Sequence, residues 1–414
     1  MAIIKPFKGI RPTNDKVHLV ASRPLDNYKT QELNAKLAEN PYTFLQIIKP
    51  EFGQSIKTKP GSTENLKKIK TKFEDFCKED ILYADQEETF YIYQQINGNE
   101  SSTGIIGCAS IDDYFNNIIK KHEQTLTHKE EILKNYLEVC EFNAEPVSLI
   151  FPSTDKIDDF LQSIAKEKPE YDFTTTDKLR HKLWIVNTAK EIELITSQFK
   201  KISSIYIADG HHRTASSALL GKQKRERQVE YTGDEPFNYL MAIFFPENQL
   251  KIYDYNRIIK DLNGLSVKEF IAEVSKKFEV NKIDSEVYKP NQNHNFSMYV
   301  DGIWYSLNAK VGTYNPTDPI DSLDAAILSN NILEPILGIK DLKTDKRVGF
   351  INGIKGMKEL KHQVDTLKAD VAFGLYPVTM EQLKLISETN NIMPPKSTWV
   401  EPKLRSGLTI FSLK

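Results

Sequence analysis

The sequence predicts an α/β (α+β) protein with mixed sheets, in which a strand–turn–helix element forms the core and further α/β elements lie at both ends. Residues 182–245 alternate between strand and helix patterns, as is typical of an α/β layer. Residues 88–95 and 104–111 flank Asn97-Gly98, a strong signal for a β-hairpin. Amphipathic helical patterns such as residues 66–80 lie between strand patterns.

Apolar periodicity and turn residues predict the elements of the first 166 residues. A period of 3.6 residues indicates a helix, and short runs of β-branched and aromatic residues indicate strands. The expected order is a helix at 31–39, a strand at 42–49 that ends at Pro50-Glu51, the helix at 66–80, the hairpin, a long helical stretch at 112–143, a strand at 147–151 and a helix at 154–166.

The rest of the chain is predicted in the same way. The core alternates between strands and helices, with strands at 183–186, 205–208 and 239–245 and helices at 190–200 and 214–227. A strand pattern at 250–255 follows, and then a helix and strands between 267 and 307. The last elements expected are helices at 322–332 and 358–368, a strand at 371–375, a helix at 380–390 and a strand at 408–412. We therefore expect three regions, at 1–145, 146–265 and 266–414, with the core in the second.

Composition excludes several classes of protein. The 414 residues include 55 basic and 57 acidic ones, with a formal net charge of -2, so no field for sequence-independent binding of nucleic acid is expected. No apolar run approaches the roughly 18 residues that span a bilayer, and no signal peptide is apparent. Three separated cysteines suit a reducing compartment. We expect a cytoplasmic protein without a nucleic-acid or membrane partner, and a homodimer remains open.

The segment at 207–216, IADGHHRTAS, is the strongest functional signal. A strand that turns sharply into a helix leaves backbone N–H groups pointing at the turn, which makes an anion site. His211, His212 and Arg213 add groups that can be cationic, and Asp209 adds a carboxylate that could act as a base. The combination points to chemistry on phosphate. The alternative is that Asp209 only caps the helix and that the histidines are polar surface.

Other phosphate and catalytic signatures are missing from the sequence. It contains no G-x-x-x-x-G-K-[ST], G-x-G-x-x-G, G-x-S-x-G or C-x-x-C pattern. His122-Glu123 resembles the start of a zinc-protease motif, but the next histidine is His128, on a different helix face. We therefore expect no metal site built from protein ligands alone.

Two more polar clusters could bind a ligand. Residues 393–407 present cations and hydroxyls among stiffening prolines, which suits an anionic ligand; the alternative is an extended tail with its cations in water. These side chains are Lys396, Ser397, Thr398, Lys403 and Arg405. Residues 116–125 contain His122 and Glu123, and here the alternative is a polar helix face.

With these motifs in order, the chain resembles the family known as domain of unknown function 1015 over nearly its whole length. The resemblance rests on IKPFKGIRP at 4–12, VASRP at 20–24, NPYTF at 40–44 with Pro50-Glu51, IKKHEQT at 119–125, DGHHR at 209–213 and MPPKST at 393–398. One position departs, because Leu25 stands where many members have tyrosine after the proline.

A more distant similarity suggests chemistry. The strand–DGHHR–helix element looks like the phosphate-binding turn of the ParB/sulfiredoxin superfamily, which includes free serine kinases. In those kinases the turn holds nucleotide phosphates, its Asp contributes to catalysis, and a Glu from an earlier segment is the base. The resemblance implies a catalytic Asp209, Glu51 as the base, Mg²⁺ with ATP or ADP, and phosphate binding by Gly210, His211, His212, Arg213 and Thr214.

The resulting expectation is a small-molecule kinase that transfers phosphate from ATP or ADP to a hydroxyl acceptor, with free L-serine, giving O-phosphoserine, as the leading candidate. The charges of the acceptor would pair with cations of the clusters above or with Arg11 and Arg23. Two alternatives are a ParB-like nucleotide-binding switch or adaptor, and a phosphohydrolase in which His211 or His212 carries the phosphoryl group.

Overall fold

The computed structural model describes residues 1–228 and 230–414, which form two compact units. Unit 1 comprises Met1–Lys120, Thr125–Leu250 and Pro402–Lys414, and unit 2 comprises Lys121–Gln124 and Lys251–Glu401. Unit 2 is thus an insertion, after which the chain returns to unit 1. The expected boundaries at residues 145 and 265 do not coincide with the boundaries of these units. The division into three regions stays a prediction.

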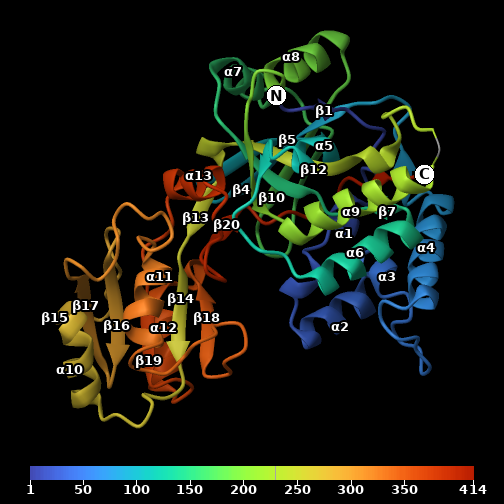
Figure 1. Ribbon diagram of the computed structural model, residues 1–414. Helices are drawn as coiled ribbons and strands as arrows, with labels where there is room; N and C mark the ends of the chain where they lie inside the picture. Colours follow the sequence, from blue (N-terminus) through green and yellow to red (C-terminus); the bar gives the residue numbers. More distant parts are fainter. Residues whose placement is uncertain (229) are drawn as a thin grey trace. The chain divides into compact units, whose positions relative to one another are not determined.

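Unit 1 is built on a mixed sheet (Figure 1). The order is β6 (Ile119–Lys120), β11 (Ile205–Asp209), β8 (Val147–Phe151), β12 (Tyr239–Pro246), β5 (Glu100–Ser110), β4 (Phe90–Asn97), β10 (Arg180–Val186) and β9 (Tyr171–Thr174), and β1 (Ile4–Lys5) also pairs with β5. β11 is parallel to β6 and antiparallel to β8, whereas β8 and β12 are parallel. The predicted hairpin and the mixed α/β class are confirmed.

Both faces of this sheet are covered by helices. Side chains alternate along β12, so Phe244 lies in one apolar core and Ile243 and Phe245 lie in another. The first core also contains residues of α7 (Asp155–Ile164) and α8 (Ala189–Phe199), whereas the second contains residues of α6 (Thr127–Cys140) and α9 (His211–Arg227).

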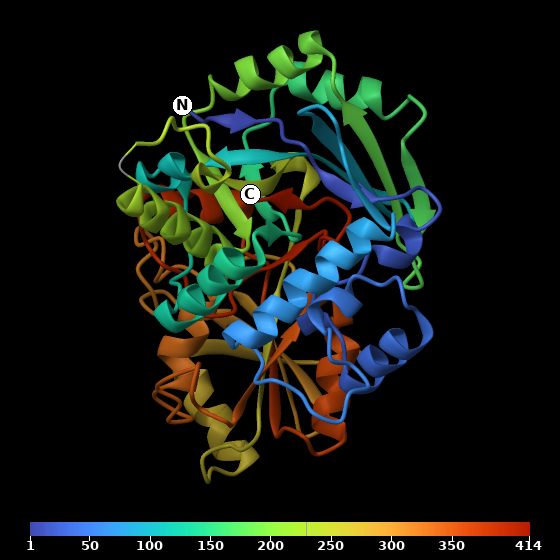
Figure 2. The ribbon, with the colours of Figure 1, turned by 90° about the vertical axis from the view of Figure 1, so that its right-hand side faces the viewer.

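An outer helical layer completes unit 1. α3 (Leu45–Ile48) and α4 (Thr63–Lys78) pack with α6 around a third core that includes Phe44, Phe73 and Phe142. Figure 2 shows α4 in light blue beside α6 in teal. The smaller elements are β2 (Ile10–Pro12), α1 (Val17–Val20), α2 (Thr30–Glu39), β3 (Leu82–Ala84), α5 (Ile111–Phe115), β7 (Phe142–Asn143) and β21 (Phe411–Ser412).

Unit 2 contains an antiparallel sheet with helices on both faces. Its order is β15 (Phe278–Ile283), β17 (Ile303–Ala309), β16 (Asn295–Val300), β19 (Val371–Gly374), β14 (Tyr255–Ile259) and β18 (Val348–Asn352). Apolar residues of α10 (Val267–Lys277) and α11 (Asp324–Leu328) share one core, and those of α12 (Gly356–Asp365) share another. β13 (Lys251–Tyr253) pairs with β20 (Trp399–Glu401), and α13 (Met380–Glu388) starts at a capping box.

The strand expected at 42–49 is wrong, because the segment contains the short helix α3. A strand would bury alternate residues, but Phe44, Leu45 and Ile47 are all buried. The aliphatic composition that favours a strand serves here to pack α3 against α4.

The continuous helix expected at 112–143 is also wrong. α5 ends at Phe115, Asn117 has a positive φ of 56°, and β6 then joins the sheet beside β11 before α6 begins at Thr127. Pairing of β6 with the sheet satisfies backbone groups that a longer helix would have bonded internally. The last strand is likewise shorter than the expected 408–412 and is confined to β21.

Candidate functional site

The DGHHR segment forms a sharp turn between β11 and α9. Gly210 adopts a φ of +99° and is the N-cap residue of α9, where no side-chain hydrogen bond caps the helix. The pairing of β11 with β8 shifts register between Ile207 and Asp209, and such a bulge re-aims the side chain that follows it. Asp209 is therefore the last residue of the strand, and the N-cap position belongs to Gly210.

Asp209 stands between two cations of unit 1. Its Oδ2 is 3.2 Å from Nη2 of Arg213, and its Oδ1 is 3.3 Å from Nζ of Lys403. Its side chain is 45% exposed, so the carboxylate stays accessible to a ligand. Lys403, expected to bind substrate, thus meets the carboxylate of the turn.

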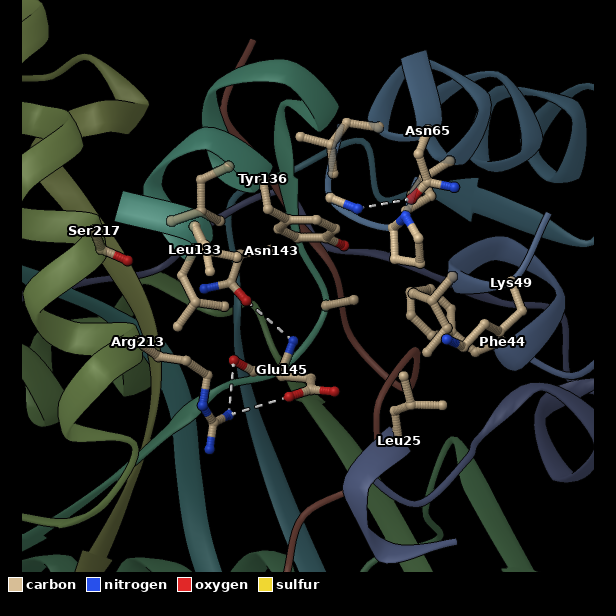
Figure 3. A pocket seen from close by; sticks show the side chains of 18 residues that line it. Leu25, Phe44, Lys49, Asn65, Leu133, Tyr136, Asn143, Glu145, Arg213 and Ser217 are labelled. Carbon is tan, nitrogen blue, oxygen red and sulfur yellow. Dashed lines mark hydrogen bonds and ion pairs between the residues drawn. The ribbon is translucent and has the colours of Figure 1, made fainter. Parts of the chain in front are cut away.

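Arg213 is held in place by the segment that precedes β8. Its Nη1 donates to the carbonyls of Pro146 at 2.8 Å and Glu145 at 3.3 Å. The carboxylate of Glu145 lies 3.8 Å from the same nitrogen and accepts a hydrogen bond from Ser406 at 2.7 Å. Figure 3 shows Arg213 and Glu145 facing each other. Two carboxylates and two cations therefore balance in charge around the turn.

The two histidines of the turn are less exposed than a surface role would require. His211 is 5% exposed, and His212 is half-buried. Burial lowers the pKa of His212, and Lys129 lowers it further, so its imidazole is neutral at neutral pH. Thr214 is fully buried and donates its hydroxyl to the carbonyl of Gly210 at 3.1 Å. Arg213 is therefore the residue of the turn that carries a permanent positive charge.

Arg213 lines a cavity of about 320 Å³ in unit 1 (Figure 3). This first cavity is bounded by α3, α4, α6 and α9, and its volume is at the low end for small-molecule sites. Its polar lining includes Lys49, Asn65, Tyr136 and Glu145. The walls are mostly apolar, with Leu25, Phe44, Ile48, Leu66, Ile69, Ile132, Leu133 and Leu137.

Glu51, the expected base, lines a second cavity of about 330 Å³. Both cavities are lined by Ile48, Lys49, Pro60 and Asn65, so they adjoin. The Glu51 carboxylate is 6% exposed and accepts from the backbone and hydroxyl of Thr58, from Asn65 and from Lys68. These donors, Lys68 foremost, lower the pKa of Glu51 to about 2. In this arrangement Glu51 is a weak proton acceptor and ties Thr58 to α4.

The three expected substrate-binding arginines are all paired elsewhere in unit 1. Arg11 is buried and binds Asp85 at 2.8 Å and Glu170 at 3.0 Å. Arg405 is buried and binds Asp177 at 2.6 Å. Arg23 pairs with Glu32 and lies 4.3 Å from the ring of Tyr28. None of the three arginines lines either cavity.

The remaining expected residues lie in unit 2, where two sequence clusters meet. His122 is buried, and its carbonyl accepts from the backbone of Met393 at 2.9 Å, with Glu123 adjacent in the chain. The long-range contact joins IKKHEQT to MPPKST. His122, Glu123 and the MPPKST segment therefore share a unit that does not contain the DGHHR turn.

A buried arginine shapes the MPPKST loop. Arg257 is fully buried and donates to the carbonyls of Lys396 at 2.9 Å and Pro395 at 3.3 Å. Lys396 is exposed and has a φ of 57°, Ser397 donates to the carbonyl of Pro394 at 2.7 Å, and Thr398 is half-buried. The loop is therefore rigidly supported, and a role for it in binding substrate stays a prediction.

Sequence reasoning missed Lys49, Glu145 and Tyr136. Lys49 directly precedes Pro50-Glu51, a motif that was recognised, so that motif could have led to it. Glu145 and Tyr136 have no local signal, because only folding brings them to Arg213 and to the first cavity.

No described helix is long and apolar enough to cross a membrane. No group of three or more His, Cys, Asp or Glu among the described residues could hold a metal ion.

Comparison with solved structures gives matches of low identity. A free serine kinase in complex with AMP is 12% identical, with coverage of 73% of this chain and 90% of that one and a TM-score of 0.36. SbnI with a C-terminal truncation from Staphylococcus aureus is 10% identical, with coverage of 73% and 85% and a TM-score of 0.39. A conserved hypothetical protein from Pyrococcus furiosus is 12% identical, with coverage of 74% and 94% and a TM-score of 0.35.

Comparison of sequences gives the family. No curated protein matches the chain. One family model, described as protein of unknown function (DUF1015), matches residues 4–326. The motifs between residues 4 and 213 lie within this match, whereas MPPKST at 393–398 lies beyond it, and the chain belongs to the DUF1015 family.

Proposed function

We propose that this protein is a nucleotide-dependent phosphotransferase that moves phosphate from ATP or ADP to the hydroxyl of a small acceptor, with free L-serine as the leading candidate. The observation that carries the proposal is the DGHHR turn at the cavity wall. There the N-cap residue of α9 is Gly210, which has no side chain, Arg213 lines the cavity, and Asp209 lies 3.2 Å from Arg213. A helix start with an arginine is a site for phosphate.

The charges of the turn suit phosphoryl transfer. This reaction depends on positioning and on cations that stabilise the transferred group. Arg213 and Lys403 would bind the phosphates, and their present partners, Asp209 and Glu145, would be released to face the acceptor. Asp209 would then take the proton of the acceptor hydroxyl, or would hold that hydroxyl in line for attack on the transferred phosphate. Glu51 could serve as the base only after exchanging its contacts with Thr58 and Lys68.

Magnesium would enter this site with the nucleotide. Since no described group of three or more ligating side chains is present, the protein would contribute at most Asp209 and Glu145, which is sufficient for an ion that keeps water and phosphate ligands. When bound there, Mg²⁺ would neutralise the negative charge of the phosphates.

The test is product formation by the purified protein. With Mg²⁺, ATP or ADP and L-serine, we expect O-phosphoserine in ³¹P NMR spectra, and we expect Asp209→Asn to lower the rate by about 100-fold or more, as is typical for loss of a catalytic carboxylate. Asp172→Asn is the matched control, because Asp172 forms a surface pair with Arg180 at 2.7 Å in the same unit.

Other outcomes would assign a different function. Absence of nucleotide-dependent transfer to any of a panel of amino acids, hydroxy acids and polyols would reject the proposal. Nucleotide affinity without turnover would support a switch or adaptor. A phosphohistidine trapped at His211 or His212 by rapid quench would support the phosphohydrolase.

A further inference from the structure

Lys49 stands where the two cavities of unit 1 adjoin, because it lines both of them. It is the C-cap residue of α3, its N–H donates to Leu45 at 2.9 Å, and its carbonyl accepts from Phe52 at 3.0 Å. The backbone is thus held on both sides. The side chain is half-buried, and it has no hydrogen-bond or ion-pair partner among the residues that the structure describes.

The other charged groups of the first cavity are already neutralised. Arg213 contacts Asp209 and Glu145, and Glu145 also accepts from Ser406. In the adjoining cavity, Glu51 is paired with Lys68. Lys49 therefore presents a positive charge that the surrounding protein does not balance, beside largely apolar walls. A half-buried ammonium in such a place gains most from an anion that arrives with a ligand.

Tyr136 offers a second donor to the same space. Its ring packs against Phe142 at a centroid distance of 5.8 Å, while its hydroxyl has no hydrogen-bond partner among the described residues. In Figure 3 this hydroxyl points into the cavity, toward the side where Asn65 and Lys49 lie. Burial raises the pKa of Tyr136, so the phenol keeps its proton at neutral pH and can donate it.

We propose that Lys49 and Tyr136 bind the carboxylate of the acceptor. By this contact Lys49 selects hydroxy acids and amino acids over neutral polyols. The proposal rests on the phosphotransfer proposed above, and it adds the chemical class of the acceptor and the residues that recognise it. The acceptor would lie along the apolar wall, with its carboxylate at Lys49 and its hydroxyl toward Arg213 and Asp209.

The charge of the site favours a carboxylate over a second phosphate. One ammonium and one phenol match a group with one negative charge, whereas a phosphate monoester carries about 1.5 to 2 negative charges at neutral pH. Phosphate groups are also commonly bound by the planar guanidinium of arginine. Selection against a neutral acceptor follows because a neutral ligand displaces water from Lys49 without replacing its interactions. A buried polar group that is left unpaired is what gives a site strong discrimination.

The experiment compares acids with partners of similar size in which an uncharged group replaces the carboxylate. Transfer to L-serine and glycerate is measured beside L-serinamide and glycerol, in the wild type, Lys49→Met, Lys49→Arg and Tyr136→Phe, and binding of each acceptor is measured by calorimetry without nucleotide. We expect the wild type to prefer the acids by about 10- to 100-fold, as for hydrogen bonds to charged groups, through KM more than through kcat. Lys49→Met should abolish this preference and Lys49→Arg should keep most of it.

Tyr136→Phe separates binding from folding, because it removes the hydroxyl and keeps the ring that packs on Phe142. We expect a several-fold rise in KM for the acids, with an unchanged melting temperature and no change for serinamide. Equal use of acids and their neutral partners by the wild type, or a preference that persists in Lys49→Met, overturns the proposal and leaves phosphotransfer standing. If the wild type transfers no phosphate, the proposed function fails, and calorimetry then tests the carboxylate site by itself. Binding of the acids that depends on Lys49 supports this site, and absence of binding overturns it.

Discussion

Asp324 is expected to make the stability of unit 2 depend on pH. Its side chain is 6% exposed, and its two oxygens accept hydrogen bonds from the backbones of His294 at 2.9 Å and Tyr376 at 3.3 Å. Burial outweighs these bonds and raises the pKa of Asp324 to about 7. An unfolded aspartate titrates near 3.9, so between about pH 4 and pH 7 the folded chain binds the proton that the unfolded chain has lost.

The sign and the size of the effect follow from this difference. Stability falls with rising pH wherever the folded state binds more protons. The gap between about 7 and about 3.9 corresponds to about 4 kcal/mol, so the free energy of unfolding should fall by up to this amount between pH 4 and pH 8. The loss should accumulate steadily between about pH 4 and pH 7 and level off above about pH 7, once Asp324 is ionised in the folded chain as well.

The assay is urea unfolding followed by the fluorescence of Trp304, which is buried in unit 2, in a Trp184→Phe and Trp399→Phe background. Asp324→Asn should remove most of the pH dependence, although its amide can accept only one of the two backbone N–H groups and should lower stability at pH 5. Asp301→Asn is the matched control, since Asp301 is exposed and has a φ of 49°, which asparagine tolerates. A pH slope in Asp324→Asn equal to that of the wild type would refute the reasoning.

Two further substitutions test the turn and its helix. Arg213→Lys should raise the Kd for nucleotide about tenfold or more in calorimetry, because lysine cannot hold the Pro146 carbonyl and grip phosphate in a bidentate way; an unchanged Kd would remove Arg213 from the phosphate site. Gly221→Ala should cost about 1–3 kcal/mol in scanning calorimetry, as overpacking does, because its Cβ would overlap Ile111 and the Phe237 carbonyl; a wild-type melting temperature would show that α9 can move.

Strong local signals predicted the fold best. The Asn97-Gly98 turn located the β4–β5 hairpin, and the alternation after residue 182 located β10, α8, β11, α9 and β12. The failures came where distant contacts overrule local preference. The apolar residues of α3 pack on α4 and do not join a sheet, and β6 interrupts a helical pattern because β11 offers it a partner. Neither partner is visible within a window of neighbouring residues.

By itself, the sequence determined the DGHHR turn, the family and the identity of the charged groups, because a tight turn through glycine and a helix start depend on residues that are neighbours in the chain. Tertiary structure alone decided which carboxylate meets which cation. Lys403 reaches Asp209 from almost two hundred residues away, and Arg11 and Arg405 are paired with other carboxylates. At the junction of two cavities, Lys49 has no hydrogen-bond or ion-pair partner in the part of the chain that the structure describes. Such pairings depend on distance in space and on burial, which set the strength of a charge interaction.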